Sequence, residues 1–278
     1  YGITNLKYPL IPSSFMPAVT NYLAKDYEAG YQNWACAQGS NGEMYFGNSQ
    51  GLLVYDGYRW TLHKVPGNHI VRSVYVKEDR IYVGAFEEFG YFKYSEAGTL
   101  RYHSLSKFLK NFPMENNEIW NIVELDGRIY FQSFSAWFSY DGKMVHAFRN
   151  RQQQPLYFYT QNGHIYTQMI DEDFYEFDGK DFLHLFPRSQ VNDDNVVALL
   201  PDGDDSFLMV TENNGLFRYN GDITPWKTDI DAELKKQRVN RAVMTNDSIF
   251  MIGTVLNGIY AIDRKGHCLW HFNLDNRL

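Results

Sequence analysis

Short runs of apolar and aromatic positions, each closed by a turn, recur along the whole chain. The recurring phrase is an apolar pair, a small or polar residue, a loop, and then an apolar-x-aromatic stretch that ends in a turn. Its first copy runs from Met44-Tyr45-Phe46-Gly47 through a short loop to Leu53-Val54-Tyr55-Asp56-Gly57. Aromatic residues suit pleated strands and Gly suits tight turns, so each phrase predicts a pair of antiparallel strands.

The phrase repeats at a nearly constant spacing. Equivalent positions are 37 to 46 residues apart along the chain, at Tyr55, Tyr94, Tyr140, Phe177, Tyr219 and Ile262. This period is typical of the four-stranded blades of a β-propeller.

Each repeat divides further into four strands. In the first repeat these are residues 34–38, 43–48, 52–55 and 58–62, with the last strand reached through Asp56-Gly57. Asp-Gly favours a hairpin because both residues tolerate positive φ. Six repeats are visible, and their inner strands are expected to begin near Trp34, Ile70, Ile119, Leu156, Val196 and Val239.

Two segments interrupt the strand pattern. In residues 104–112, Leu105, Phe108, Leu109 and Phe112 have the i, i+3, i+4, i+7 spacing of one helical face. A short helix that packs on the sheets is predicted there, and a second over residues 231–238.

The sequence predicts two parts: an N-terminal segment, residues 1–32, and a propeller over residues 33–278. The chain ends in what resembles a linker to another repeat. We therefore expect the complete protein to continue beyond residue 278 and to form seven blades, with the N-terminal segment contributing strands that close the ring.

Composition supports the all-β assignment and narrows the function. Tyr, Phe and Trp number 21, 20 and 6, and the formal net charge is −7. A protein that binds nucleic acid needs clustered Lys and Arg to neutralise phosphates, so the acidic balance argues against that class. No stretch approaches the ~18 apolar residues of a membrane span. Only Cys36 and Cys268 occur, and we expect buried free thiols rather than a disulfide or a zinc site.

Six phrases recur along nearly the whole chain in a characteristic order and spacing: Gln32-Asn33-Trp34, Tyr45-Phe46-Gly47-Asn48, Tyr82-Val83-Gly84, Glu88-Phe89-Gly90-Tyr91-Phe92, Glu118-Ile119-Trp120-Asn121 and Tyr140-Asp141-Gly142. Together they resemble a known family, the two-component regulator propeller found in the sensor regions of bacterial signalling proteins. The sixth repeat departs from it, with Ile262-Asp263-Arg264 in place of an aromatic-Asp-Gly turn.

The resemblance implies a periplasmic sensor module of a regulator anchored in the inner membrane. In that family a triple-tyrosine domain, a transmembrane segment and a histidine kinase or helix-turn-helix output follow the propeller, and the sensor often responds to glycans or their breakdown products. The expected partners are therefore a small-molecule or oligosaccharide ligand and a second copy of the protein, which would form a homodimer through the propeller or the downstream domains.

In a four-stranded blade, the loop between the second and third strands lies on the same face as the linker to the next blade. We call this the loop face, and the opposite one the hairpin face. The loop face mixes carboxylates, amides and aromatic rings, which suit the hydroxyls and C–H faces of a carbohydrate. The candidate ligand-binding residues are Trp34, Asn48, Phe86, Glu87, Glu88, Trp120, Trp137, Asp171, Asp173, Glu212, Asn213, Asn240 and Asn257.

Other readings of these residues stay open. Trp34, Trp120 and Trp137 could instead pack between blades, and residues 86–88 could form a solvated loop. Residues 171–173 lack the spaced, Gly-turned pattern of a calcium loop, so a plain acidic loop is favoured. His267 and His271 would lie ~13 Å apart on one strand, too far to bind one ion.

No catalytic motif stands out. The Asp-box phrase of sialidase-like propellers is missing, the quinone-propeller phrase has one near-match at residues 261–270, and no Ser-His-Asp arrangement or phosphate loop occurs. The sequence thus predicts a sensor without enzyme activity, cofactor or metal. A scaffold propeller that binds another protein or a second copy of itself is the alternative, and a glycan-processing enzyme is the third hypothesis.

Overall fold

The computed structural model describes residues 18–149, 153–245 and 249–275. The chain divides into two compact units: one is Tyr22–Phe158, and the other is Tyr159–Leu278 with residues 18–21 of the N-terminal segment. We call them the 22–158 unit and the 159–278 unit.

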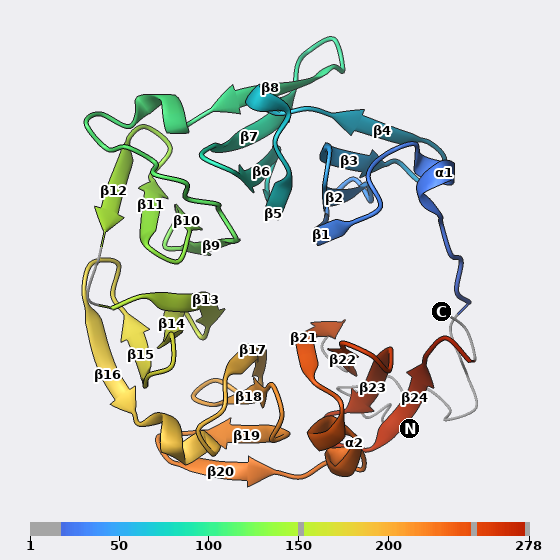
Figure 1. Ribbon diagram of the computed structural model, residues 1–278, viewed down its shortest axis with the longest axis vertical. Helices are drawn as coiled ribbons and strands as arrows, with labels where there is room; N and C mark the ends of the chain where they lie inside the picture. Colours follow the sequence, from blue (N-terminus) through green and yellow to red (C-terminus); the bar gives the residue numbers. More distant parts are fainter. Residues whose placement is uncertain (1–17, 150–152, 246–248, 276–278) are drawn as a thin grey trace, which may run out of the picture. The chain divides into compact units, whose positions relative to one another are not determined.

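The described residues form six four-stranded antiparallel sheets, each with its strands in chain order (Figure 1). These are the blades of a β-propeller, as the repeat predicted. In the 22–158 unit, blade 1 has β1 (Asn33–Gln38), β2 (Met44–Asn48), β3 (Gly51–Tyr55) and β4 (Trp60–His63); blade 2 has β5 (Val71–Lys77), β6 (Arg80–Ala85), β7 (Phe89–Tyr94) and β8 (Leu100–Ser104); blade 3 has β9 (Asn121–Leu125), β10 (Arg128–Gln132), β11 (Ala136–Tyr140) and β12 (Val145–Arg149).

The remaining blades follow the same plan. Blade 4 has β13 (Pro155–Gln161), in which the unit boundary falls, β14 (His164–Met169), β15 (Phe174–Phe177) and β16 (Phe182–Phe186); blade 5 has β17 (Val196–Pro201), β18 (Phe207–Thr211), β19 (Leu216–Tyr219) and β20 (Ile223–Trp226); blade 6 has β21 (Val239–Thr245), β22 (Ile249–Thr254), β23 (Ile259–Asp263) and β24 (Cys268–Phe272). Every inner strand begins within two residues of its predicted start.

The helices are short. They are α1 (Ala24–Tyr27), α2 (Asp231–Lys236) and the 3-10 turns η1 (Pro66–Asn68), η2 (Ser106–Phe108) and η3 (Arg188–Val191). Helix α2 confirms the prediction for residues 231–238. The helix expected over residues 104–112 is wrong in length, because only η2 forms there.

The segment around η2 still packs as its apolar spacing indicated. Leu105 is buried, and the Phe112 ring lies 5.3 Å from the Phe138 ring, whereas Phe108 is exposed. Pro113 follows, and a residue before proline is disfavoured in the helical region, which opposes continuation of the helix.

The N-terminal segment lies outside any strand where the structure describes it. Residues 18–32 contain α1 and coil, and the Tyr22 ring packs 5.2 Å from Trp60 of blade 1. Residues 1–17, on which most of the predicted ring closure depends, lie outside the described residues. The seventh blade therefore stays a prediction.

A glycine one residue before the end of the second strand lets neighbouring blades approach. A Cβ added to Gly84 would lie 2.4 Å from Ile119 Cγ2, and one added to Gly47 would lie 2.8 Å from the Val71 carbonyl oxygen. Both distances are far below van der Waals contact. The Tyr-x-Gly phrases in the sequence thus mark places where the next blade packs directly on the backbone.

Aspartate fixes the aromatic-Asp-Gly hairpins. Asp56 Oδ1 accepts hydrogen bonds from the backbone N–H groups of Arg59 and Tyr58, at 2.6 and 2.8 Å. Asp141 and Asp178 accept the equivalent pairs in blades 3 and 4. These hydrogen bonds lower the pKa of all three carboxyls. In each case the bond from the backbone N–H three residues further along the chain has the larger effect.

We expect these turn aspartates to make the protein acid-sensitive. A carboxyl whose pKa is lowered in the folded state stabilises the fold above its unfolded pKa of about 3.9, and that contribution is lost as the pH falls through the folded pKa. The free energy of unfolding in urea should therefore fall between about pH 4 and pH 2, and the triple variant Asp56→Asn, Asp141→Asn, Asp178→Asn should fall less steeply. Substituting the exposed Asp204 and Asp205 is the control; an equal change of slope would contradict the assignment.

The core lies between neighbouring blades. In the 22–158 unit, one buried cluster joins blades 1 and 2 and another joins blades 2 and 3. In the 159–278 unit, equivalent clusters join blades 4 and 5 and blades 5 and 6, with Leu234 of α2 in the latter. Burial between successive sheets is what a propeller requires of its repeat.

The cysteines are free, as expected, but only partly buried. Cys36 is exposed on β1 and Cys268 is of intermediate exposure on β24. The expectation of buried thiols is wrong for Cys36, because the even-numbered residues of β1, which include Trp34 and Gln38, are all exposed.

Candidate functional site

The loops and linkers predicted to share the loop face do meet in the 22–158 unit. The loop after β6 pairs with the linker into β9: Glu87 N–H donates to the Asn117 carbonyl at 2.8 Å, and Phe86 and Glu118 form an isolated β-bridge. The site can therefore be built from residues of different blades.

Two indole rings and a guanidinium pack together on this face. The Arg72 guanidinium carbon lies 4.0 Å from the Trp34 ring centroid and 4.7 Å from that of Trp120. The two indoles are 6.2 Å apart at 80°. Each residue stands near the start of the inner strand of its blade, so three successive repeats place one side chain each at the same spot.

An acidic residue completes this arrangement. Glu118 Oε1 accepts from Arg72 Nε and Nη2, at 3.3 and 3.2 Å. The Phe134 ring extends the aromatic surface, stacked 5.9 Å from Trp120. We call Trp34, Arg72, Glu118, Trp120 and Phe134 the aromatic–arginine cluster.

The cluster combines a rigid interior with an accessible edge. The Arg72 side chain is only 12% exposed, while Trp34 is 38% exposed. A guanidinium between aromatic faces and largely desolvated is worth about 2 kcal/mol, so the rings are held in fixed positions. The exposed part of Trp34 and the partly exposed Trp120 and Phe134 form an apolar surface beside a charged pair.

The acidic loop after β6 is less open than the sequence suggested. Glu87 is exposed, but its Oε1 accepts the Asn116 N–H at 2.7 Å. Glu88 points into blade 2, where it accepts from Tyr102 and Ser104, both at 2.8 Å. Burial, and then the charge of Glu88, raise the pKa of Tyr102. Of this loop, only Phe86 and Glu87 remain candidates for ligand contact.

Two further candidates have structural roles instead. Asn48 is fully buried, donates to the Gly30 carbonyl at 2.7 Å and to Asn33 Oδ1 at 2.8 Å, and accepts the Gly30 N–H. Trp137 is 3% exposed within β11 and stacks 6.0 Å from Phe148. Both predictions of ligand contact are corrected, because neither side chain reaches the surface.

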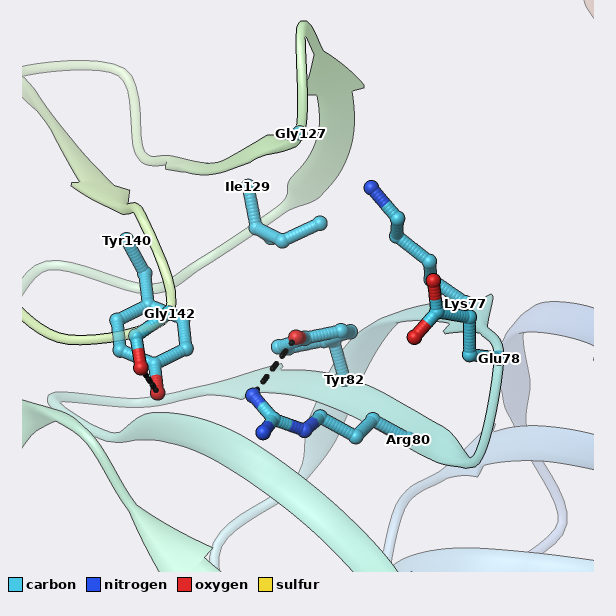
Figure 2. Close-up of a pocket in the computed structure, with 8 residues that line it drawn as sticks. All are labelled: Lys77, Glu78, Arg80, Tyr82, Gly127, Ile129, Tyr140 and Gly142. Carbon is cyan, nitrogen blue, oxygen red and sulfur yellow. Dashed lines mark hydrogen bonds between the residues drawn. The ribbon is translucent and has the colours of Figure 1, made fainter.

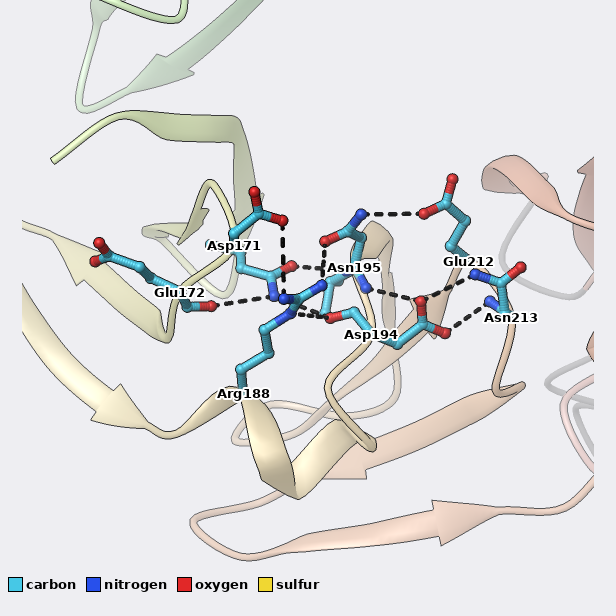
Figure 3. A network of polar contacts seen from close by, with 9 residues as sticks. Asp171, Glu172, Arg188, Asp194, Asn195, Glu212 and Asn213 are labelled. Carbon is cyan, nitrogen blue, oxygen red and sulfur yellow. Dashed lines mark hydrogen bonds and ion pairs between the residues drawn. The ribbon is translucent and has the colours of Figure 1, made fainter.

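The 159–278 unit has its own polar network on the loop face (Figure 3). Asp194 is 6% exposed, and its carboxylate accepts from the backbone N–H groups of Asn195 and Asn213, at 2.9 and 2.7 Å, and from the side-chain amides of Asn213 and Asn214. It ties the linker into β17 to the loop after β18.

A chain of side chains runs past Asp194. Arg188 Nη2 donates to Asn195 Oδ1 at 3.0 Å, and Asn195 Nδ2 donates to Glu212 Oε2 at 3.0 Å. Arg188 also lies 3.8 Å from Asp171, and Glu212 pairs with Arg238. Glu212 is buried, Arg188 and Asn195 are partly buried, and the ends of the chain, Asp171 and Arg238, are exposed.

The candidates in this unit therefore differ in access. Asp171 and Asn213 are exposed, whereas Glu212 is 8% exposed and held by its partners. Asp173 accepts hydrogen bonds from the Arg188 backbone N–H at 2.8 Å and from His184 at 2.9 Å. Both bonds lower the pKa of Asp173, and the bond from Arg188 has the larger effect. Asn240 is exposed on β21, and Asn257 donates to the Tyr260 hydroxyl at 2.7 Å.

Within the described ranges, no three His, Cys, Asp or Glu side chains are placed to hold a metal ion. His271, one of the two histidines near the end of the sequence, has a structural role: its ring stacks 4.0 Å from the Tyr260 ring and hydrogen-bonds the Asn257 carbonyl.

The sequence missed the side chains that organise both sites. Arg72, Glu118 and Phe134 in one unit, and Arg188, Asp194 and Asn195 in the other, were not among the candidates. A signal existed for Arg72, since it stands near the start of the second inner strand, as Trp34 does in the first.

A scan against protein-family models and a search of curated proteins find no match. Solved structures do match. Two are extracellular domains of one B. thetaiotaomicron protein, described as a putative hybrid two component system (18% identity, TM-score 0.63, over 84% of this chain) and as a putative one component system (17% identity, TM-score 0.66, over 90% of this chain).

This chain has the propeller fold of those regulator domains. The resemblance that the sequence motifs indicated is thus confirmed at the level of the fold. The chain spans about a third of the length of these two neighbours, 32% and 35%.

The same fold also occurs in an enzyme. Virginiamycin B lyase from Staphylococcus aureus matches at 12% identity and TM-score 0.69, over 92% of this chain and 87% of that chain. The fold alone does not choose between sensing and catalysis, so function has to be argued from the site. In the described part of the chain, no helix is both long and apolar enough to cross a membrane.

Proposed function

We propose that this chain is the ligand-sensing propeller of a bacterial regulator, a two-component or related transcriptional system, and that it works outside the cytoplasm, in the periplasm. Its similarity in fold to two extracellular regulator domains supports this placement. The ligand is a glycan or a breakdown product of one.

The aromatic–arginine cluster carries the proposal. Sugar rings present C–H faces that pack on aromatic side chains and hydroxyls that need fixed hydrogen-bond partners. The exposed Trp34 edge and the partly exposed Trp120 and Phe134 supply the apolar surface. Glu118 and Glu87 supply acceptors beside it.

Signalling requires the ligand to favour one arrangement of the receptor over another. A tenfold preference is worth about 1.4 kcal/mol. The cluster draws its residues from blades 1, 2 and 3, so a bound saccharide would contact several blades at once. Such contacts are able to supply a preference of this size.

Ligand binding should depend on the two indoles. An oligosaccharide panel in a thermal-shift assay identifies an active sugar, and calorimetry then measures its affinity. We expect Trp34→Ala and Trp120→Ala each to weaken binding about tenfold, because each removes a stacking surface at little cost in hydrogen bonds.

Tyr58 provides the matched control. It is an exposed aromatic, 83% accessible, in the β3–β4 hairpin on the hairpin face, and Tyr58→Ala should leave affinity unchanged. An equal loss of sugar affinity in Tyr58→Ala and Trp34→Ala would contradict the proposed binding site. Mass that rises with concentration in light scattering, without any sugar response, would favour the scaffold or homodimer instead, and turnover of the panel would favour an enzyme.

A further inference from the structure

A cavity lies on the hairpin face between blades 2 and 3, away from the aromatic–arginine cluster (Figure 2). Its volume is about 220 Å³. Pockets for drug-sized ligands hold about 300–1,000 Å³, so this one suits a smaller molecule. It is lined by Lys77, Glu78, Arg80, Tyr82, Gly127, Ile129, Tyr140 and Gly142.

Two hydrogen-bond donors converge in this cavity. Arg80 Nη1 lies 3.5 Å from the Tyr82 hydroxyl, and Figure 2 shows the two groups pointing toward one another. Tyr82 is 4% exposed, and among the described residues its hydroxyl hydrogen has no acceptor. The hydroxyl accepts from Arg80 and is therefore free to donate to a bound acceptor.

The Arg80 charge is also uncompensated at short range. The guanidinium stacks 4.6 Å from the Tyr91 ring, and no carboxylate of the described residues lies within ion-pair distance of it. Asp79 acts on it only from further away, because Asp79 pairs with Lys93.

The other charges around the cavity do not cancel this one. Lys77 pairs with Glu124 at 3.0 Å. Glu78 lines the cavity but is exposed, so solvent screens its charge. The Tyr140 hydroxyl faces Arg80 and donates to the Gly142 carbonyl at 2.8 Å. The cavity therefore offers a cation and a hydroxyl donor to an anion.

We propose that this cavity binds a small free carboxylic acid, whose carboxylate accepts from Arg80 and Tyr82 and whose apolar body packs on Ile129 and the tyrosine rings. Guanidinium and carboxylate form charge-assisted bonds, often in pairs, and these are about twice as strong as neutral ones. This site is independent of the saccharide proposal, since it shares no residue with the aromatic–arginine cluster.

Benzoate and benzamide test the proposal as matched probes, because they share one ring and differ in charge. In the full chain labelled with ¹⁵N-glycine, the amide signals of Gly127 and Gly142 report the cavity, with ionic strength held constant. We expect a saturable shift with benzoate and binding of benzamide at least about tenfold weaker.

Variants assign the contact. Arg80→Gln should weaken benzoate about tenfold, Tyr82→Phe should weaken it severalfold, and Glu78→Gln should strengthen it. Arg101→Gln removes the same charge from an exposed position on β8 and should change nothing. Equal affinity for benzoate and benzamide, or no saturable shift, would overturn the proposal. Wild-type affinity for benzoate in Tyr82→Phe would also overturn the proposal. This variant removes a single oxygen atom, so it still tests the site if Arg80→Gln folds poorly.

Discussion

Phe131→Ala should lower the free energy of unfolding by about 3–5 kcal/mol, the range for removing a fully buried phenylalanine ring. Phe131 on β10 has no exposed surface, and its ring lies 4.6 Å from Phe89 and 6.1 Å from Tyr82, both in blade 2. The substitution removes the contact through which blades 2 and 3 bury each other. Urea unfolding followed by far-UV circular dichroism measures the loss.

Phe108→Ala is the matched control, because it removes the same ring from a position that is 57% exposed. Its effect should stay within about 0.5 kcal/mol. If both variants lose similar stability, the core does not lie between the blades as described.

Asp194→Asn should cost about 3 kcal/mol, although it changes the side chain by only one atom. The buried carboxylate accepts four hydrogen bonds, and an amide supplies one acceptor oxygen and adds two donors that have no acceptor there. We expect the loop after β18 and the linker into β17 to separate, since Asp194 joins them. Thermal unfolding together with hydrogen exchange of the Asn213 amide measures both effects.

Asp205→Asn makes the same chemical change at an exposed position and should be neutral. A neutral result for Asp194→Asn, or unchanged exchange at Asn213, would show that the network does not hold the loops.

The architecture could be predicted because the repeat determines it locally. Three adjacent residues are enough to form the aromatic-Asp-Gly turn, because Asp56 accepts the backbone N–H groups of the turn and Gly57 adopts a φ of 97°. Such features need no knowledge of distant residues, so the strand limits followed from the sequence within about two positions.

The site could be predicted only in part, because it depends on contacts between repeats. Arg72 lies about forty residues from Trp34 along the chain, and nothing in either neighbourhood indicates that they stack. The same applies to Glu88: the sequence places it on the loop face, but the direction of its side chain follows from partners on β8, Tyr102 and Ser104.

The prediction that Trp137 contacts a ligand was wrong for a different reason. As a loop-face candidate, Trp137 was expected in a loop over residues 134–137, whereas β11 begins at Ala136 and Trp137 is 3% exposed. All five residues of β11 are buried, so a residue that belongs to this strand lies inside the sheet packing on either face.

The most direct test of the account is which tryptophans a bound saccharide touches. In protein labelled with ¹⁵N-tryptophan, the indole N–H signals of Trp34 and Trp120 should shift on addition of the sugar found active in the thermal-shift panel, and those of Trp137 and Trp226 should stay in place. Shifts confined to other tryptophans, or no response to any sugar in the panel, would contradict a saccharide sensor built on the aromatic–arginine cluster.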